Sequence, residues 1–303
     1  MGRGRRVAGE EPIGYRHRTM DNAAIMSPPQ TIFETQAGAD RRERMRSAMD
    51  DLLTAGTMWR LSWTLALLDI KLRYRGSILG PFWLTLSSAL TIGMMGVLYS
   101  YLFHMDVSHY FPFLALSIVL WNFMLQMVND ATACFISAEA MIRSVRLPMM
   151  LHPMRAVLRN LLILAHNAVV IIIVDLAMNA WPGWIGILAI PAFLLWLVVS
   201  LAMSLLLGAL CARFRDIPPI VASLMQLAFF VSAIIWEPSQ LGQHEWMLVF
   251  NPVFTLLEII RAPLLGELPS LLVTFSALAY SAIIIFLASM LFVRVRGRIP
   301  FWV

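Results

Sequence analysis

Apolar blocks long enough to cross a bilayer alternate with short basic links along most of this 303-residue chain. A helix needs about 20 mostly apolar residues to cross the hydrocarbon core of a membrane. Six blocks meet or approach that length, at residues 81–103, 111–128, 161–180, 184–210, 217–236 and 268–293. Charged residues make up only 14% of the chain, against about 25% in a soluble domain. The pattern predicts an all-α integral membrane protein with six transmembrane helices.

The basic residues fall in alternate links, and this distribution predicts an orientation. Of the 23 basic residues, all but Arg261 lie before the first block, between the second and third, between the fourth and fifth, or after the last. Lysine and arginine concentrate on the cytoplasmic side of membrane proteins. We therefore expect a multi-pass protein with both termini in the cytoplasm. The same placement accounts for the net charge of +5 and argues against binding to nucleic acid.

The N-terminal part of the chain divides into two segments. Residues 1–46 are polar and rich in arginine, which predicts a disordered cytoplasmic tail that precedes a transmembrane domain at 47–303. The tail has no apolar run of the kind found in a secretory signal peptide. From Ser47 to Leu72, Leu52, Trp59 and Trp63 recur at helical spacing beside charged residues. This second segment is predicted to be an amphipathic helix in the headgroup region.

The segment before the last block is apolar in pieces that are too short to span a membrane. Trp246–Phe250 and Val253–Ile260 are separated by Asn251-Pro252. Short apolar pieces broken by proline predict re-entrant half-helices. Glu258 and Arg261 are three residues apart on one helical face and could pair within the membrane, or be exposed to water, where such a pair contributes little.

Four motifs in order resemble the ABC type-2 exporter permeases for polysaccharides, which include the exporters of O-antigen, teichoic acid and capsule. They are Lys71–Trp83 before the first block, Ile142–Pro148, Arg213–Ile217, and Asn251-Pro252 with Leu256–Arg261. The resemblance covers the chain from about residue 50 to its end. The arginine-rich tail is not part of the family pattern.

The resemblance implies a function, an assembly and a location. The chain would be the permease subunit of an ATP-driven exporter in the bacterial inner membrane, a homodimer surrounded by lipid, with two copies of a separate ABC ATPase. A lipid-linked glycan would be the cargo. The chain has no G-x-x-x-x-G-K-[ST] motif, so it cannot hydrolyse ATP by the P-loop mechanism. We expect a transport subunit without enzymatic activity, with no cofactor of its own, and with ATP used by the partner.

Candidate cargo contacts lie around the first block. Arg73, Tyr74, Arg75 and Gly76 precede it, at the depth of the headgroups. Arginine binds phosphate through two parallel hydrogen bonds, so these residues could contact the pyrophosphate of a lipid-linked glycan, or simply anchor the protein by charge. Tyr99 and Tyr101 stand near the other end of the block, where they could line a sugar channel or belong to an interfacial aromatic belt.

The ATPase is expected to dock on the link between the second and third blocks. A short helix between Ala138 and Leu147 would carry Glu139, Arg143 and Arg146, and Pro148 would end it. Motion of the ATPase would reach the membrane helices through this helix. An ordinary polar turn that holds the orienting charges is the alternative.

Polar residues elsewhere offer weaker candidates. His104, Asp106 and His109 are three potential ligands close together, but a polar loop accounts for them and no metal site is predicted. Several polar or ionisable residues interrupt the blocks, and ionisable groups there are costly. They are Asn122, Gln126, His166, Asn167 and Asp175, for which hydrogen bonding between helices is favoured over a proton relay.

Three rival functions remain open. An ABC type-2 exporter of a drug or small lipid would share the fold and the partner. A membrane-embedded enzyme acting on polyprenyl lipids should gather carboxylates or histidines at one membrane face, and no such cluster stands out. A proton-coupled secondary transporter should show internal repeats with matching broken helices, but only one region is broken.

Overall fold

The computed structural model describes residues 2, 41–77, 80 and 82–303, and within them every regular element is a helix. In chain order the elements are α1 (Arg41–Thr57), α2 (Trp59–Arg73), α3 (Phe82–Phe103), α4 (Val107–Ala133), η2 (Ile136–Ala138), α5 (Glu139–Ser144), α6 (Leu151–Met178), η3 (Gly183–Leu188), α7 (Ala189–Arg213), α8 (Ile217–Val231), η4 (Pro238–Phe250), α9 (Pro252–Leu264), α10 (Leu271–Val295), η5 (Arg296–Arg298) and α11 (Ile299–Trp302). The predicted all-α membrane fold is confirmed.

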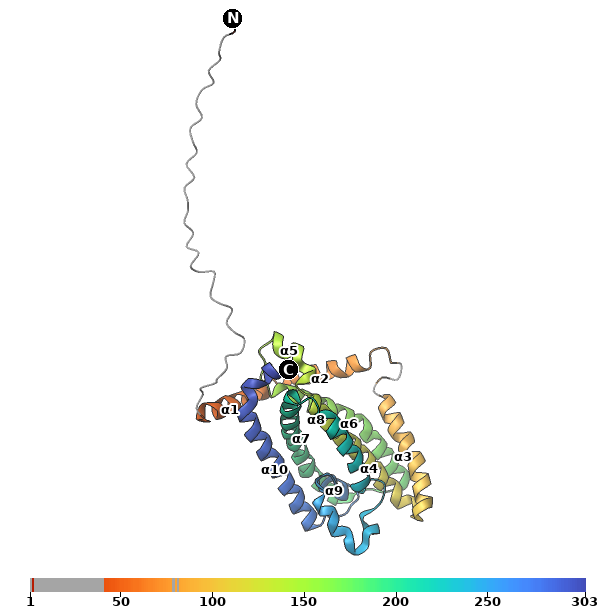
Figure 1. The fold of residues 1–303 in the computed structure, drawn as a ribbon. Coiled ribbons are helices and arrows are strands. Elements are labelled where there is room, and N and C mark those ends of the chain that lie inside the picture. The colour runs from red at the N-terminus through yellow and green to blue at the C-terminus, as the bar shows by residue number, and fades with distance from the viewer. Residues whose placement is uncertain (1, 3–40, 78–79, 81) are drawn as a thin grey trace. The chain divides into compact units, whose positions relative to one another are not determined.

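The long helices form a bundle with two distinct ends. Figure 1 shows α3, α4, α6, α7, α8 and α10 running between them. One end, which we call the arginine end, carries α1, α2, α5 and the C-terminal Val303. The opposite end carries the turn between α3 and α4 together with η3 and η4.

Helix α4 forms the centre of the bundle. It contacts α3, α6, α7, α8 and α9, and its residues from Phe113 to Leu120 are all buried. A helix that is apolar on every side is stable in a protein core or in a membrane, and here neighbouring helices surround α4. The other long helices expose large apolar side chains, such as Met94 on α3, Leu176 on α6 and Phe275 on α10. Such large apolar faces are not stable in water, so lipid or another protein chain must cover them.

Close packing of α3 on α4 depends on one glycine. A Cβ atom at Gly96 would lie 2.7 Å from the ring of Phe111. Only a residue without a side chain allows this ring to approach the helix so closely, as small residues do between membrane helices generally.

Five helices among the described residues have the length and apolar character of a membrane span, at Thr85–Leu102, Val107–Ala133, Leu151–Met178, Gly183–Arg213 and Leu271–Trp302. The predicted fifth span at 217–236 is shorter than expected, because α8 has 15 residues. Its length is about 22 Å, less than the hydrocarbon thickness of about 30 Å. Ala233, just beyond it, adopts a left-handed backbone with φ of 49°, which stops the helix. The bent pair η4 and α9 gives a sixth span if counted as one.

The predicted half-helices are present, and Asn251-Pro252 separates them as expected. The axes of η4 and α9 differ by 116°. The side chain of Asn251 accepts hydrogen bonds from the backbone N–H groups of Val253, at 3.0 Å, and Phe254, at 3.3 Å. This is an N-cap interaction, and Pro252 occupies the first position of α9, where its missing N–H costs nothing.

Three predicted boundaries differ from the structure near the arginine end. The second block, predicted to end at residue 128, continues as α4 to Ala133. The expected single amphipathic helix is two helices, α1 and α2, which break at Met58. Gly56 and Thr57 precede the break, both poor helix formers, and the Thr57 hydroxyl bonds the carbonyl of Thr54 at 2.8 Å. The third span begins at Leu151 rather than 161, because Pro153 falls in the first helical turn, where proline is tolerated.

The predicted tail at 1–46 falls mostly outside the described residues, apart from Gly2 and from Arg41 onward. Helix α1 begins at Arg41, so residues 41–46 belong to the folded part of the chain. On α2, Trp59, Leu68 and Leu72 are exposed, as an interfacial helix requires.

Candidate functional site

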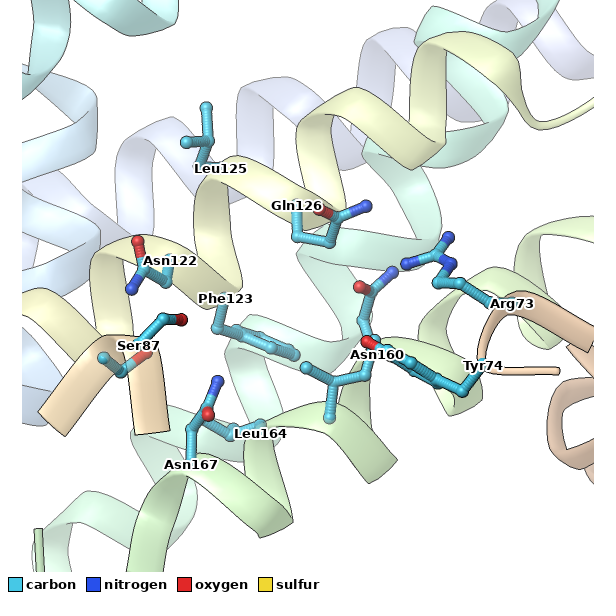
Figure 2. Close-up of a pocket in the computed structure, with 12 residues that line it drawn as sticks. Arg73, Tyr74, Ser87, Asn122, Phe123, Leu125, Gln126, Asn160, Leu164 and Asn167 are labelled. Carbon is cyan, nitrogen blue, oxygen red and sulfur yellow. The ribbon is translucent and has the colours of Figure 1, made fainter. Parts of the chain in front are cut away.

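A polar cavity of about 380 Å³ lies between the end of α2 and the membrane helices α3, α4 and α6. Its lining residues are Arg73, Tyr74, Ser87, Ser88, Asn122, Phe123, Leu125, Gln126, Asn160, Ile163, Leu164 and Asn167. In Figure 2, Arg73 and Tyr74 lie on one side of the cavity, Ser87 and Asn122 lie on the other, and Phe123 stands between them. Four carboxamides and two serine hydroxyls give this cavity a polar lining inside an otherwise apolar bundle.

A second cavity of about 240 Å³ adjoins the first. It shares Ser87, Ser88 and Asn122 with the first cavity and adds Thr91, Met95, Ile118, Trp121 and Phe229. Since Thr91 and Met95 lie further along α3 and Ile118 lies closer to the start of α4, this cavity extends toward the opposite end of the bundle. The two cavities together mark a polar and aromatic route along α3 and α4.

An ion-pair network lies next to the cavity, at the arginine end. Asp69 of α2 accepts hydrogen bonds from Arg155, with Nε at 2.8 Å, and from Arg159 Nη1 at 2.7 Å. Arg159 also donates through Nη2 to Asp130 of α4, at 2.7 Å. The network therefore joins α2, α4 and α6.

The electrostatics of Asp69 follow from these partners. Burial acts to raise the pKa of its carboxyl, but the hydrogen bonds and positive charges of Arg155 and Arg159 outweigh burial, so the pKa lies below its usual value.

Tyr74 lines the cavity as a neutral phenol. Desolvation raises the pKa of its hydroxyl, and the opposing positive charge of Arg73 is the smaller effect. The hydroxyl therefore keeps its proton and can donate a hydrogen bond into the cavity.

Asp130 orients two of the cavity amides. It accepts hydrogen bonds from Asn160 Nδ2 at 2.6 Å and from Gln126 Nε2 at 2.9 Å. An ionised carboxylate only accepts hydrogen bonds, so both NH₂ groups must face Asp130. The amide oxygens of Asn160 and Gln126 are consequently turned away from it.

Two amide oxygens on α6 are left without donors. Asn160 Oδ1 and Asn167 Oδ1 are both buried, and neither accepts a hydrogen bond from any residue that the structure describes. The residues themselves are 1% and 6% exposed. A buried acceptor without a donor costs about 1–3 kcal/mol, and such groups are rare enough in folded proteins to require an explanation.

The residues predicted to contact cargo do not all meet at this cavity. Arg73 and Tyr74 line it. Arg75 and Gly76 are exposed beyond α2 and are not among its lining residues. Tyr99 packs against the core near the opposite end of α3, and Tyr101 is 77% exposed on the outside of the bundle. A role for these four residues stays a prediction.

Sequence reasoning missed Asp69, Asp130, Arg155 and Arg159 as a group. A signal was present in the four-residue spacing of Arg155 and Arg159, which places both on one face of α6. The acidic partners come from α2 and α4, and only the tertiary fold brings them to that face. Asn122, Gln126 and Asn167 were singled out as polar residues within spans, and all three line the cavity.

The predicted docking helix is α5, at the arginine end. Arg143 pairs with Glu139 at 2.9 Å, and its guanidinium also donates to the carbonyl of Val303. Ile142 is buried. Arg146 is exposed but lies beyond α5, which ends at Ser144. The predictions that this helix carries Arg146 and is ended by Pro148 are therefore wrong, because Val145 already adopts an extended backbone with ψ of 134°. The carbonyl of Pro148 accepts a hydrogen bond from the Leu151 N–H at 3.1 Å, and this bond precedes the first turn of α6.

A clamp around Asp51, which the sequence did not reveal, holds the same region. The buried carboxylate of Asp51 on α1 accepts hydrogen bonds from the backbone N–H groups of Met149, at 3.0 Å, and Met150, at 2.9 Å. Arg296 donates to it through Nε at 3.0 Å. This one side chain therefore ties α1, the link between α5 and α6, and the C-terminal segment together.

Arg261 of α9 is fully buried, so the water-exposed alternative for the Glu258–Arg261 pair is wrong. Its Nε donates to Glu258 at 2.9 Å, and Nη1 donates to Ser117 Oγ at 2.8 Å and to the Ala233 carbonyl at 2.6 Å. The guanidinium carbon also lies 4.5 Å from the centroid of the Phe113 ring. Arg261 thus joins the half-helix to α4 and to the end of α8.

The remaining candidates have local roles. Asp106 accepts a hydrogen bond from the Ser108 N–H at 3.1 Å and so caps α4, while His109 lies 3.2 Å from Glu237. No group of three or more potential metal ligands occurs among the residues searched, which are the described ones. His166 bonds the carbonyl of Leu162 within its own helix at 2.8 Å.

The sequence of the chain is similar to those of known membrane transport proteins. Residues 60–265 match the profile of the ABC-2 type transporter family. The O-antigen export system permease protein RfbA of Myxococcus xanthus is 25% identical over 197 residues, which are 64% of this chain and 76% of that protein. A protein of the same name from Klebsiella pneumoniae is 20% identical over 191 residues, covering 62% of this chain and 74% of that protein.

Proposed function

The chain belongs to the ABC-2 type transporter family, and from this premise we propose that it is the permease subunit of an exporter that moves a lipid-linked polysaccharide of the O-antigen kind across the inner membrane. The observation that carries the proposal is the pair of adjoining polar cavities within an apolar bundle. The names of the relatives from Myxococcus and Klebsiella support this type of cargo.

The lining of the cavities suits a glycan whose lipid carrier ends in phosphate. Arg73 at the mouth can bind phosphate through two hydrogen bonds. Beyond it, amides and hydroxyls offer hydrogen bonds to sugar hydroxyls, and Phe123 and Trp121 offer apolar faces. Sites that combine aromatic surface with a few placed polar groups are typical of specific ligand binding. The phosphate would then enter beside α2, and the glycan would move along α3 and α4.

ATP hydrolysis by a separate subunit would drive the movement. In this proposal the ATPase docks on α5, and two copies of each subunit form the exporter. Contacts at the arginine end support the role of α5, because the Asp51 clamp and the Arg143–Val303 hydrogen bond connect its surroundings to α1, α6 and the C-terminus. A push on α5 would thus reach three elements of the bundle at once.

Deletion of the gene and purification of its product test this function. In the deletion strain we expect loss of the surface polysaccharide and accumulation of its lipid-linked precursor inside the cell. A tagged chain should co-purify an ABC ATPase, and charge reversal by R143E/R146E should abolish co-purification and export. R298E, which reverses an exposed arginine beyond α10, is the matched control and should retain both.

Three outcomes would contradict the proposal. Normal surface polysaccharide in the deletion strain would show that this polysaccharide is not the cargo. Translocation by the purified chain without any nucleotide-hydrolysing partner would show that transport does not depend on a separate ATPase. Retained co-purification in R143E/R146E would show that the ATPase does not dock on α5.

A further inference from the structure

A third cavity, of about 270 Å³, lies between α4, α7, α8, α9 and α10, and we call it the apolar cavity. The polar groups among its lining side chains are the hydroxyl of Ser200 and the ring nitrogen of Trp196, and the other side chains are apolar. The lining residues are Phe123, Met124, Val128, Trp196, Val199, Ser200, Met203, Leu207, Val221, Leu224, Met225, Pro252, Val253, Leu256 and Ile284. The proposed function makes no use of this cavity.

The apolar cavity and the polar cavity lie on different sides of α4. Met124 and Val128 line the apolar cavity, whereas Asn122 and Gln126 line the polar one. Residues two positions apart on an α-helix point about 200° away from each other, so these two pairs occupy nearly opposite faces. Phe123 lines both cavities and stands at the boundary between them. A ligand of the apolar cavity is therefore separate from a ligand of the polar one.

The shape of the apolar cavity suits an extended chain. On α7 its lining runs from Trp196 to Leu207, eleven residues or roughly 16 Å along the helix axis. Leu224 of α8 also lines it and is 59% exposed on the outside of the bundle. The cavity thus follows the long axis of the bundle and reaches an outer face of α8.

Neither water nor empty space is a stable filling for such a cavity. A buried water needs two to four polar partners, and this lining offers few. An empty void deprives the surrounding side chains of dispersion contacts. Smaller apolar cavities, of about 150 Å³, stay dry and bind benzene. Next to a membrane helix, the apolar group at the highest concentration is the acyl chain of a phospholipid.

We propose that the apolar cavity binds one acyl chain of a bilayer phospholipid, which fills the space between α4, α7, α8 and α9. The lipid carrier of a cargo is the other hydrocarbon source in the membrane. Its phosphate would lie beside Arg73, on the far side of α4, so the occupant of the apolar cavity is a second lipid that stays with the protein. The proposal concerns this resident lipid and does not depend on the identity of the cargo.

Two adjacent valines on α7 provide a matched test. Val199 lines the cavity and is 5% exposed, whereas Val198 is not among the lining residues and is 49% exposed. A phenyl ring at position 199 takes the place of part of the acyl chain and removes its dispersion contacts. Phospholipid retained by the full chain in mild detergent, counted by native mass spectrometry, should therefore fall roughly tenfold in V199F. V198F should retain as much as the native protein.

A second pair of variants covers the case in which V199F does not fold. Leu224 and Leu227 are both exposed on α8, but only Leu224 is among the lining residues. Because both positions already face outward, L224W and L227W should fold. L224W should lower phospholipid retention, and L227W should leave it unchanged.

Lipid added back to delipidated protein identifies the ligand. Phosphatidylethanolamine should raise the melting temperature of the native chain and of V198F by a few degrees, because a ligand that binds only the folded state stabilises it. V199F should not respond. Undecaprenyl phosphate, added in a parallel series, should give no shift that V199F abolishes.

Three results would overturn the inference. The first is a native chain that retains no phospholipid and does not respond to its addition. The second is equal retention in V199F and V198F, or in L224W and L227W if V199F is unfolded, which would mean that the lipid only coats the outside. The third is retention of a polyprenyl phosphate in place of phospholipid. All of these measurements are made without an export assay, so they can fail while the proposed function stands.

Discussion

Single residues hold the bundle together at places where the chain must depart from a plain apolar helix. Arg261 is the clearest case, since one fully buried guanidinium bonds Glu258, Ser117 and a backbone carbonyl. Its charge is tolerated because a carboxylate and the face of Phe113 surround it. Arg261 thereby fixes α9 at the opposite end of the bundle, where the proposed route must leave the membrane.

Replacing Arg261 by methionine should destabilise the protein strongly. R261M leaves Glu258 in a poorly hydrated site without its partner, and breaking a buried ion pair in this way costs about 3–5 kcal/mol. We expect a clear fall in the midpoint of chemical unfolding in detergent. The double variant E258L/R261M should recover part of the loss, since it removes both charges. R298M, at an exposed site, should behave like the native protein. A native midpoint for R261M would show that the pair contributes nothing.

At the scale of elements, the interfacial helix α2 is docked onto α6 by charge and not by apolar burial. Only Ser62 and Ala66 of α2 are buried, while Asp69 bonds both Arg155 and Arg159. Because Arg73 and Tyr74 follow directly and line the cavity, the docking of α2 sets the position of the proposed phosphate contact.

The docking of α2 should depend on the charge of Asp69. D69N should release α2, at a cost of roughly 2 kcal/mol for hydrogen bonds to charged groups. Acid should do the same in the native protein. The pKa of Asp69 is lowered in the fold, so its contribution is fully present above the unfolded value of about 3.9 and is lost as the pH falls through the lower folded value.

A spin-label distance between α2 and α6 measures this docking, with labels placed at exposed Leu68 and Ile172. The distance distribution should broaden in D69N at neutral pH, and in the native protein only below about pH 4. D50N is the matched control, because Asp50 is an exposed carboxylate on α1 and its replacement should change nothing. An unchanged distribution in D69N would show that apolar contacts suffice.

The described part of the molecule gathers its arginines at one end and has the bent pair of helices η4 and α9 at the other, and this asymmetry sets its expected orientation. The arginine end collects α1, α5, the network around Asp69 and the C-terminus. Acidic residues and histidines such as Asp106, His109 and Glu237 lie at the opposite end. The positive-inside rule predicts that the arginine end lies in the cytoplasm.

Reporter fusions test this orientation. A reporter that is active only in the cytoplasm should be active when fused after Val303, and a reporter active only outside should be active when inserted beside Gly242. Gly242 is exposed in η4 and has open space around it, so an insertion there should be accepted. The reciprocal fusions serve as controls and should be silent. If instead the cytoplasmic reporter is active beside Gly242 and the outside reporter is active after Val303, the topology is the reverse of the expected one. In that case α5 faces away from the cytoplasm and cannot be the docking site of a cytoplasmic ATPase.

The sequence by itself determined that the chain is a helical membrane protein, the approximate positions of its apolar helices and the break at Asn251-Pro252, because hydrophobic length and proline act locally along the chain. It also indicated Asn122, Gln126 and Asn167 as exceptions within the spans. Tertiary structure alone decided that these amides share one cavity, that Asp130 orients two of them, and that Asp51 and Arg261 each join distant segments. Such contacts depend on which helix faces which neighbour, and residue spacing within one helix contains no information about that choice.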